Sequence, residues 1–280
     1  MKTYYVGVAH PSWLAETNAP LFVSRSSFYK NGVRRKSFPR AKGPWALDSG
    51  GFSEIKAHGK WTVSPEQYVE DVHVFSAEVG KLQWAAIMDW MCEEQQLTRT
   101  GLKVKDHQRL STDSYLTLKD LAPRLPWTPV LQGWTLGDYE DHVEHYARAG
   151  VDLRKSPLVG VGSVCRRQAT LTAGFLFQHL ASEGLKLHGF GLKTDALVPR
   201  RPSESSPVYK LIRDSLVSAD SQSWSLQARF ARGKLCVRGT HPESQKCSNC
   251  LAWALEWRED LLERIRRDDE LQREIARSAR

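Results

Sequence analysis

The feature that most constrains the fold of this chain is a series of short apolar segments that recur along most of its length. They lie at residues 4–9, 45–47, 84–89, 128–133, 157–162, 187–192 and 216–220. Each is continuously apolar rather than alternating, which is typical of strands buried on both faces of a parallel sheet. From residue 48 onward their ends are roughly 30 to 43 residues apart, about the length of one strand–helix unit.

Helical patterns fill the intervals between these segments. Ser64, Pro65 and Gln67 have the N-cap, first-turn and capping-box positions of a helix that begins near residue 65. Gly150 and Gly184 each follow a helical stretch, at the place where helices commonly end. The alternation predicts an α/β fold, and the number of units favours a TIM-like (β/α)₈ barrel over an open sheet.

Polar residues stand at the ends of several predicted strands. Asp48 ends the segment at 45–47 and is followed by Ser49 and Gly50, while Asp220 ends the last segment. An acid beside glycine can be ordinary turn chemistry. In a barrel, however, the carboxyl ends of all strands converge on one face, so a shared pocket explains the recurrence better. The other strand-end residues that we assign to this pocket are Asp89, Gln132 and Gly162.

The C-terminal part differs in character, and we expect two units: a barrel over residues 1–232 and a small zinc-binding segment with a terminal helix over 233–280. Four possible ligands for a structural zinc ion lie close together in the sequence: Cys236, His241, Cys247 and Cys250. An odd count of five cysteines that includes a CxxC pair suits a metal in a reducing compartment better than a disulfide framework. The alternative is free thiols near the surface. In the terminal helix, we expect a packed stripe of Leu251, Leu255, Leu262 and Ile265.

The charge balance favours an anionic partner. The chain has 40 basic and 32 acidic residues, a net charge of +8, so nucleic acid is the first expectation. Residues 24–42 hold seven Lys or Arg and no acid, with Phe28, Tyr29 and Phe38 interleaved. Phosphates favour such cations and aromatic rings can stack on bases, although a charged run can also be a solvated loop. The residues predicted to contact nucleic acid are Arg34, Arg35, Lys36 and Arg229.

The N-terminal sequence has no apolar core typical of a signal peptide, and no run approaches 18 apolar residues. We therefore expect a cytoplasmic protein that does not contact the membrane.

Several motifs resemble, in order, those of the tRNA-guanine transglycosylase superfamily. "LDSGGFSE" resembles the signature DSGGFQ, "IMDWMCEE" is similar to its FDEC segment, and "VLQGW" to its QGG/QQG segment. "LVGVGSVCR", "LHGFGLKTDALV" and "SADSQSWSLQARFARG" are similar to later segments of the family. The chain lacks the family's PTR triplet and its CxCxxC zinc pattern, and these departures fit the DpdA branch of phages and bacteria.

The resemblance implies an enzyme that exchanges guanine in DNA for a 7-deazaguanine base of the preQ0 type. It implies Asp220 as the nucleophile and Asp48 as the general acid/base, with base flipping or a single-stranded substrate. A carboxylate can accept from a guanine-like edge and an amide can donate to its carbonyl oxygen, which suits Asp89 and Gln132, with Ser49 and the Gly162 amide as further contacts. For a phage protein, the location would be the host cytoplasm. Two alternatives remain: the same exchange on tRNA, and a non-catalytic zinc-knuckle protein that binds nucleic acid.

Overall fold

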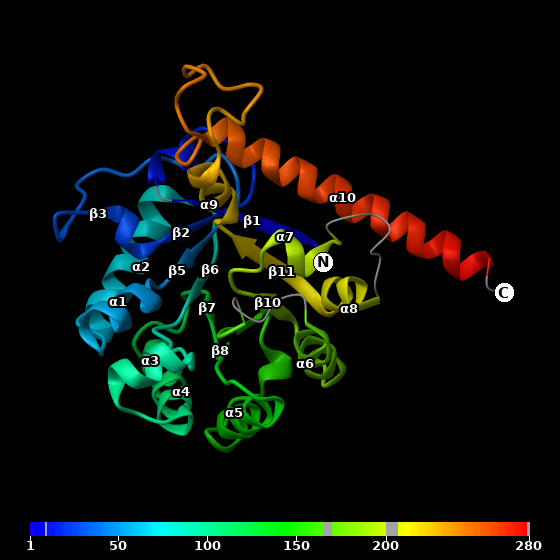
Figure 1. Cartoon of the computed structure of the whole chain (residues 1–280). Coiled ribbons are helices and arrows are strands. Elements are labelled where there is room, and N and C mark those ends of the chain that lie inside the picture. The colour runs from blue at the N-terminus through cyan, green and yellow to red at the C-terminus, as the bar shows by residue number, and fades with distance from the viewer. Residues whose placement is uncertain (9, 165–169, 200–206, 279–280) are drawn as a thin grey trace.

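The computed structural model describes residues 1–8, 10–164, 170–199 and 207–278 (Figure 1). The last two residues of the "LVGVGSVCR" segment lie outside these ranges. Nine short strands form a ring in which all neighbours are parallel, in the order β7-β6-β5-β2-β1-β11-β10-β9-β8. The strands are β1 (Thr3–Val8), β2 (Leu21–Ser24), β5 (Trp45–Asp48), β6 (Leu82–Ala86), β7 (Trp127–Thr128), β8 (Val130–Leu131), β9 (Val159–Val161), β10 (Leu187–Gly189) and β11 (Leu216–Ser221).

Strands β7 and β8 are two pieces of one extended segment that breaks at Pro129. Piece β7 pairs with β6, and piece β8 pairs with β9. Proline has no N–H to donate to a ladder, but the Pro129 carbonyl oxygen still accepts from the Gly160 amide at 2.8 Å. Counted as one staggered strand, the segment completes an eightfold ring, and the predicted (β/α)₈ architecture is confirmed.

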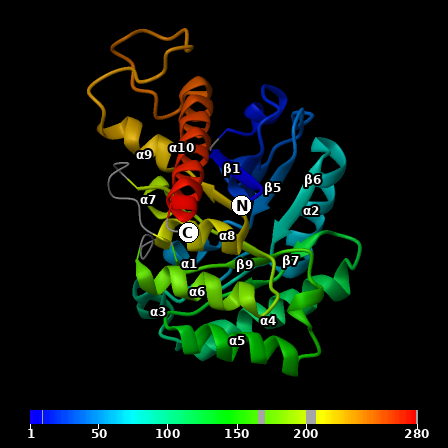
Figure 2. The ribbon, with the colours of Figure 1, turned by 90° about the vertical axis from the view of Figure 1, so that its right-hand side faces the viewer.

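Helices form the outer layer of the ring (Figures 1 and 2). They are α1 (Gly51–His58), α2 (Pro65–Val79), α3 (Glu94–Thr100), α4 (Val104–Leu121), α5 (Leu136–Arg148), α6 (Leu171–Ser182), α7 (Thr194–Leu197), α8 (Pro207–Ser215), α9 (Ser223–Phe230) and α10 (Leu251–Ser278). The predicted N-cap of α2 is confirmed, because the Ser64 hydroxyl accepts from the Gln67 amide at 3.2 Å. Within the described ranges, no helix combines the length and apolar character needed to cross a membrane.

The first two strand connections differ from the others. A 3₁₀-helix, η1 (Pro11–Ala15), follows β1, and η2 (Arg25–Phe28) with the hairpin β3 (Tyr29–Lys30) and β4 (Val33–Arg34) follows β2. These short connections leave the outer face of β1 without a covering helix from its own strand–helix unit.

Helix α10 covers that face. Its Trp257 ring lies 5.9 Å from the ring of Tyr4 on β1, and Arg258 Nε donates to the Tyr4 carbonyl oxygen at 2.9 Å. The buried residues of the helix include Ala254, Trp257 and Leu261. The predicted stripe is confirmed for Leu251, Leu262 and Ile265, which pack against the barrel core. The leucine spacing missed the more deeply buried Ala254, Trp257 and Leu261, so the stripe is centred on other residues. Its predicted members are all only partly buried: Leu251, Leu255, Leu262 and Ile265.

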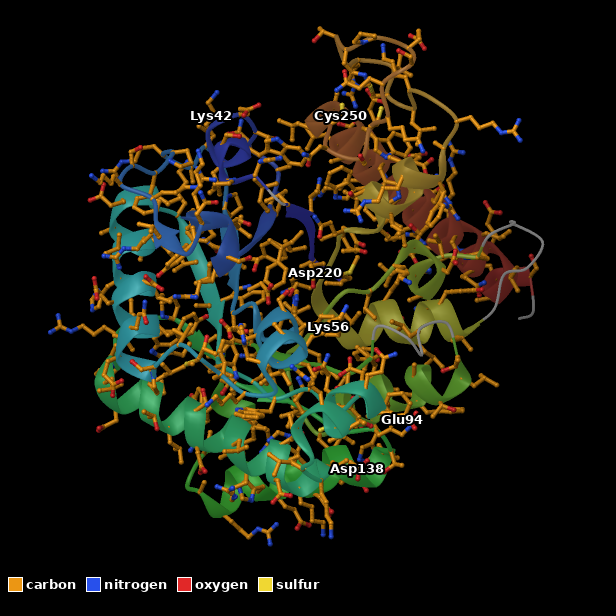
Figure 3. All side chains as sticks on the ribbon, turned by 60° about the vertical axis from the view of Figure 1, so that its left-hand side comes forward. Lys42, Lys56, Glu94, Asp138, Asp220 and Cys250 are labelled. Atoms are coloured by element: carbon orange, nitrogen blue, oxygen red, sulfur yellow. The ribbon has the colours of Figure 1, made fainter. Side chains whose placement is uncertain are left out.

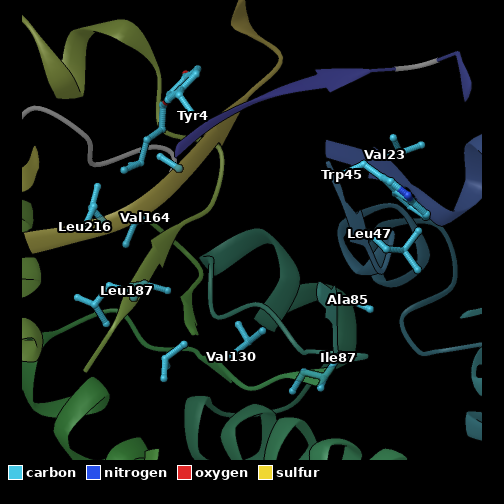
Figure 4. Close-up of a cluster of buried hydrophobic side chains, with 14 of the residues drawn as sticks. Tyr4, Val23, Trp45, Leu47, Ala85, Ile87, Val130, Val164, Leu187 and Leu216 are labelled. Atoms are coloured by element: carbon cyan, nitrogen blue, oxygen red, sulfur yellow. The ribbon is translucent and has the colours of Figure 1, made fainter. Parts of the chain in front are cut away.

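Side chains on each strand alternate between two apolar layers, as the pleat of a strand requires. Trp45 and Leu47 of β5 belong to the large cluster that also contains helix residues (Figure 4), whereas Ala46 belongs to a separate cluster inside the ring. Aromatic rings dominate the inner cluster. It is built largely from Tyr5, Phe22, Trp84 and Phe190, which surround the imidazole of His188. These side chains fill the interior of the barrel below the carboxyl ends of the strands.

Candidate active site and metal centre

A cavity of about 240 Å³ lies at the carboxyl ends of the strands. Polar side chains from the ends of β5, β6, β8 and β11 line it, and Phe22 and Phe190 contribute apolar surface. Of the predicted pocket residues, six line this cavity: Asp48, Ser49, Asp89, Gln132, Gly162 and Asp220. The strand ends thus meet at one site, with Asp220 central in the molecule and Cys250 well apart from it (Figure 3).

Asp48 is the last residue of β5 and is partly buried. Burial, together with the charge of Asp220, raises its pKa to about 6. Hydrogen bonds from the Gly50 amide and the Ser24 side chain oppose this shift, because they stabilise the ionised form. A carboxyl group with this pKa can both release and take up a proton near neutral pH.

Gly50 does not occupy the place that the sequence suggested. Its φ of +83° turns the chain into α1, and the cavity is lined by Gly51 instead. A side chain at Gly51 would meet the Trp61 ring at 2.9 Å. The two glycines therefore serve a sharp turn and a close approach, and Gly50 acts through its amide on Asp48.

Asp220 lies near the end of β11 and is 6% exposed. Its Oδ1 accepts from the Gly191 amide at 2.9 Å and lies 3.2 Å from His188 Nε2. Two donors from β10 and the residues after it thus hold one oxygen of this carboxylate, although His188 was not singled out from the sequence.

Asp89 and Gln132 form a buried pair across the cavity. Gln132 Nε2 donates to Asp89 Oδ2 at 2.5 Å, and the Ser49 hydroxyl donates to Asp89 Oδ1 at 3.3 Å. Burial and the nearby charge of Asp48 raise the pKa of Asp89 to about 7. The pair presents acceptor and donor atoms side by side, so it can bind a ligand edge that carries both N–H and carbonyl groups.

Ser163 joins this network and was missed by sequence reasoning. Its φ is +55°, uncommon for a residue with a side chain, and its hydroxyl lies 2.7 Å from Gln132 Oε1 and 3.0 Å from Glu93 Oε2. The Cys92 amide donates to the same hydroxyl at 2.8 Å. The unusual backbone of Ser163 thus orients the amide of Gln132.

The expected base contact of the Gly162 amide is not available, because this amide donates to the Leu131 carbonyl oxygen at 2.9 Å within the sheet. The glycine has another role. A side chain there would lie 2.2 Å from Gln132 Nε2, so only glycine leaves room for the amide.

Four ligand atoms from Cys236, His241, Cys247 and Cys250 lie within 4.8 Å of one another. The Sγ atom of Cys236 is 3.6 Å from that of Cys247 and 3.8 Å from that of Cys250. Metal–sulfur bonds of about 2.3 Å in a tetrahedron would place sulfur atoms about 3.8 Å apart, so this donor set fits a structural metal site. Glycine at position 239 leaves space for the Cys236 thiol, because a side chain there would lie 2.3 Å from Cys236 Sγ.

The surroundings of Cys247 favour a thiolate. Burial acts to raise its pKa, but hydrogen bonds outweigh burial and the pKa is lowered. The donors are the amides of Leu235 and Cys236, 3.2 and 3.4 Å from its Sγ, together with the side chains of Cys236 and Cys250. Thiolates are the form that binds metal ions.

The basic segment at 24–42 folds partly onto α2 rather than into solvent. Phe28 is fully buried, with its ring stacked 4.3 Å from that of Phe75, and the Phe38 ring lies 5.4 Å from Phe75. The expected stacking of these rings on bases is therefore wrong: their apolar surface is used in the core. The Tyr29 hydroxyl is likewise engaged, because it donates to Asp71.

The predicted nucleic-acid residues divide into two groups. Arg34 forms ion pairs with Glu70 at 2.7 Å and with the buried Asp71 at 3.0 Å, so its charge is already compensated. Arg35 and Lys36 are exposed, as is Arg229 at the end of α9.

Comparison with known proteins gives one family. The family model described as "DpdA: DeoxyPurine in DNA protein A" matches residues 1–279. No curated protein matches the chain.

Proposed function

The chain belongs to the DpdA family, and from this premise we propose that it exchanges guanine in DNA for a 7-deazaguanine base through a covalent glycosyl intermediate on Asp220. The observation that carries the proposal is the meeting of two carboxylates, Asp48 and Asp220, with the Asp89–Gln132 pair in one cavity. Its volume of about 240 Å³ is just below the roughly 300–1,000 Å³ of sites for drug-sized ligands, as suits a single base.

In the first half of the reaction, a carboxylate oxygen of Asp220 attacks C1′ of the deoxyribose. The C1′–N9 bond breaks, its electron pair goes to the base, and the Asp48 carboxyl group donates the proton that the leaving guanine needs. The product is an ester between Asp220 and the DNA strand.

In the second half, the Asp48 carboxylate takes the N9 proton of the incoming 7-deazaguanine. N9 attacks C1′, the ester bond breaks, and Asp220 regains its carboxylate, so that the sugar keeps its configuration. A pKa of about 6 suits a group that must serve as acid first and base afterwards.

Recognition of the base rests on the Asp89–Gln132 pair. Asp89 can accept from the ring N–H and amino group of guanine, and Gln132 has a second N–H that can donate to the carbonyl oxygen. A base that lacks these partners would leave buried polar groups unsatisfied, which is a strong source of selectivity.

The direct test is mass spectrometry of nucleosides from cells that express the protein together with a source of preQ0. We expect a 7-deazaguanine nucleoside in the DNA hydrolysate and not in the tRNA hydrolysate. The reverse result would establish the exchange on tRNA, and unmodified nucleosides in both would favour a non-catalytic nucleic-acid-binding protein.

We also propose that the Cys236–His241–Cys247–Cys250 cluster holds a structural zinc ion. The protein should contain about one zinc per chain, because four preformed ligands favour a closed tetrahedral site. Metal analysis of protein purified without chelators measures this content. Cys247→Ser should lose the metal, whereas Cys92→Ser, a matched change outside the cluster, should retain it; equal zinc in both variants would contradict the ligand assignment.

The exposed cations Arg35 and Lys36 are the proposed phosphate contacts of the basic segment. Replacing both with Ala should weaken DNA binding and reduce the magnitude of the slope of log K against log salt by roughly 1–2, because each lost phosphate contact removes about 0.9. Fluorescence anisotropy at several salt concentrations measures this slope. A double change of Lys105 and Arg109, exposed on α4, is the control; an equal slope for the wild type and the Arg35/Lys36 variant would show that the segment does not contact DNA.

A further inference from the structure

A hydrogen-bonded path links the buried side chain of His188 to the proposed nucleophile. His188 Nε2 lies 3.2 Å from Asp220 Oδ1, and His188 Nδ1 lies 2.8 Å from the Ser218 hydroxyl. The imidazole is fully buried, and Ser218 is 3% exposed. Neither residue is needed to describe the base exchange itself, so the path requires an explanation of its own.

The proton positions follow from the chemistry of the partners. An ionised Asp220 can only accept hydrogen bonds, so Nε2 of His188 must carry a proton. In the neutral imidazole Nδ1 is then an acceptor, and the Ser218 hydroxyl donates to it. Ser218 thereby fixes the tautomer in which His188 donates to the carboxylate.

The rings around His188 restrict its movement. Trp84 and Phe190 lie 4.6 and 4.7 Å from the imidazole, with interplanar angles of 63° and 76°, and Phe22 lies 5.7 Å away. In this apolar environment, a hydrogen bond to a charged oxygen is stronger than in water. The donor is therefore held in place before substrate arrives.

We propose that His188 is a positioning residue that fixes the rotamer of Asp220 and stabilises its carboxylate as a leaving group, an inference that rests on the proposed function. Both donors, His188 Nε2 and the Gly191 amide, contact Oδ1. This assigns Oδ2 as the oxygen that attacks C1′. In the ester, Oδ1 is the carbonyl oxygen and keeps both hydrogen bonds.

The two halves of the reaction should depend on His188 to different extents. When the C1′–Oδ2 bond breaks, its electron pair returns to Asp220, and the negative charge spreads onto Oδ1, where His188 donates. No proton leaves the imidazole in either step. Without the His188 hydrogen bond, the Asp220 carboxylate that leaves in the second half of the reaction is less stable, so the ester should break down more slowly. In the first half, the attacking Asp220 carboxylate is at least as basic as before, so formation of the ester should slow less.

The experiment follows the adduct between the protein and radiolabelled plasmid fragments on denaturing gels, before and after addition of preQ0. In His188→Phe, which keeps an aromatic ring, acceptor-dependent decay of the adduct should slow about 10- to 100-fold, the range expected for a lost hydrogen bond to a charged group. Adduct formation should slow less, so adduct should accumulate during turnover. A general disturbance of the fold would instead slow both steps and lower the amount of adduct.

Two amide variants separate the donor from the ring. His188→Gln can place its amide nitrogen near the position of Nε2 and should recover much of the decay rate, whereas His188→Asn reaches only the position of Nδ1 and should not. Ser218→Ala removes one hydroxyl with little change in shape and should slow decay in the same direction as His188→Phe, but less.

The outcomes separate the two proposals. If the wild-type protein forms no adduct, the covalent mechanism fails. If the wild type forms adduct and the folded His188 and Ser218 variants slow formation and decay equally, or change neither, the role of His188 is overturned while the exchange reaction stands.

Discussion

Asp220→Asn should abolish the covalent adduct with DNA and with it all detectable base exchange. The neutral amide keeps the size of the side chain and an oxygen that can accept from Gly191, but it is too weak a nucleophile to attack C1′. Incubation with labelled DNA followed by a denaturing gel measures the adduct, and binding to the same DNA should remain close to that of the wild type.

The matched control is Asp113→Asn, the same chemical change on the exposed face of α4. This variant should form adduct at the wild-type rate. Adduct formation by Asp220→Asn at that rate would show that another group is the nucleophile.

Asp48→Asn should reduce base exchange by about 10²- to 10⁴-fold, the usual contribution of a general acid/base. Because Asp220 remains, a small amount of adduct should still form, in contrast to Asp220→Asn. The incorporation of labelled preQ0 into plasmid DNA measures the exchange, and activity of Asp48→Asn within a few-fold of the wild type would remove Asp48 from the mechanism.

Asp48→Asn should also be more stable to unfolding than the wild type at neutral pH. The pKa of Asp48 is about 6 in the folded protein and 3.8 as its ordinary value, so the folded state binds the proton more tightly than the unfolded state. The stability of the wild type therefore falls as pH rises from about 4 to 6 and stays lower above that range. At about 1.4 kcal/mol per pKa unit, removing the charge should stabilise the protein by on the order of 1–3 kcal/mol above pH 6. Urea unfolding at pH 4 and pH 7.5 should show this difference only at the higher pH; a variant less stable than the wild type at pH 7.5 would contradict it.

The barrel was predictable because its strands are signalled repeatedly, by apolar segments that end in polar residues. Strand β2 was missed, because Leu21–Ser24 runs directly into the basic segment. The break at Pro129 was equally hidden, since a single apolar segment supplies both β7 and β8. The two halves of this segment pair with different strands because the ring closes there, and the local sequence does not indicate this.

The candidate site was predictable where residue type and position at a strand end coincide, as for Asp48 and Asp220, and where ligand spacing is compact, as for the cysteine–histidine cluster. His188 was hidden because it lies inside an apolar segment. Its role comes from a contact with Asp220 on β11, some thirty residues later in the chain, which the local sequence does not indicate. Phe28 and Phe38 were misassigned for a related reason. An aromatic residue in a basic segment has the same local pattern whether it faces solvent or packs on a helix such as α2.

The position of α10 against β1 has a consequence for how the protein is made. Strand β1 is synthesised before the other strands of the ring, yet one of its two parallel partners, β11, and the α10 residues that cover it, Trp257 and Arg258, come more than two hundred residues later. The outer face of β1 therefore stays uncovered until α10 has been made, and the ring cannot close until β11 has been made. Contacts of such long sequence separation slow folding and leave apolar surface open to chaperones or to aggregation in the meantime. Substitutions in α10 should accordingly lower the yield of folded protein more than they lower the activity of the molecules that do fold.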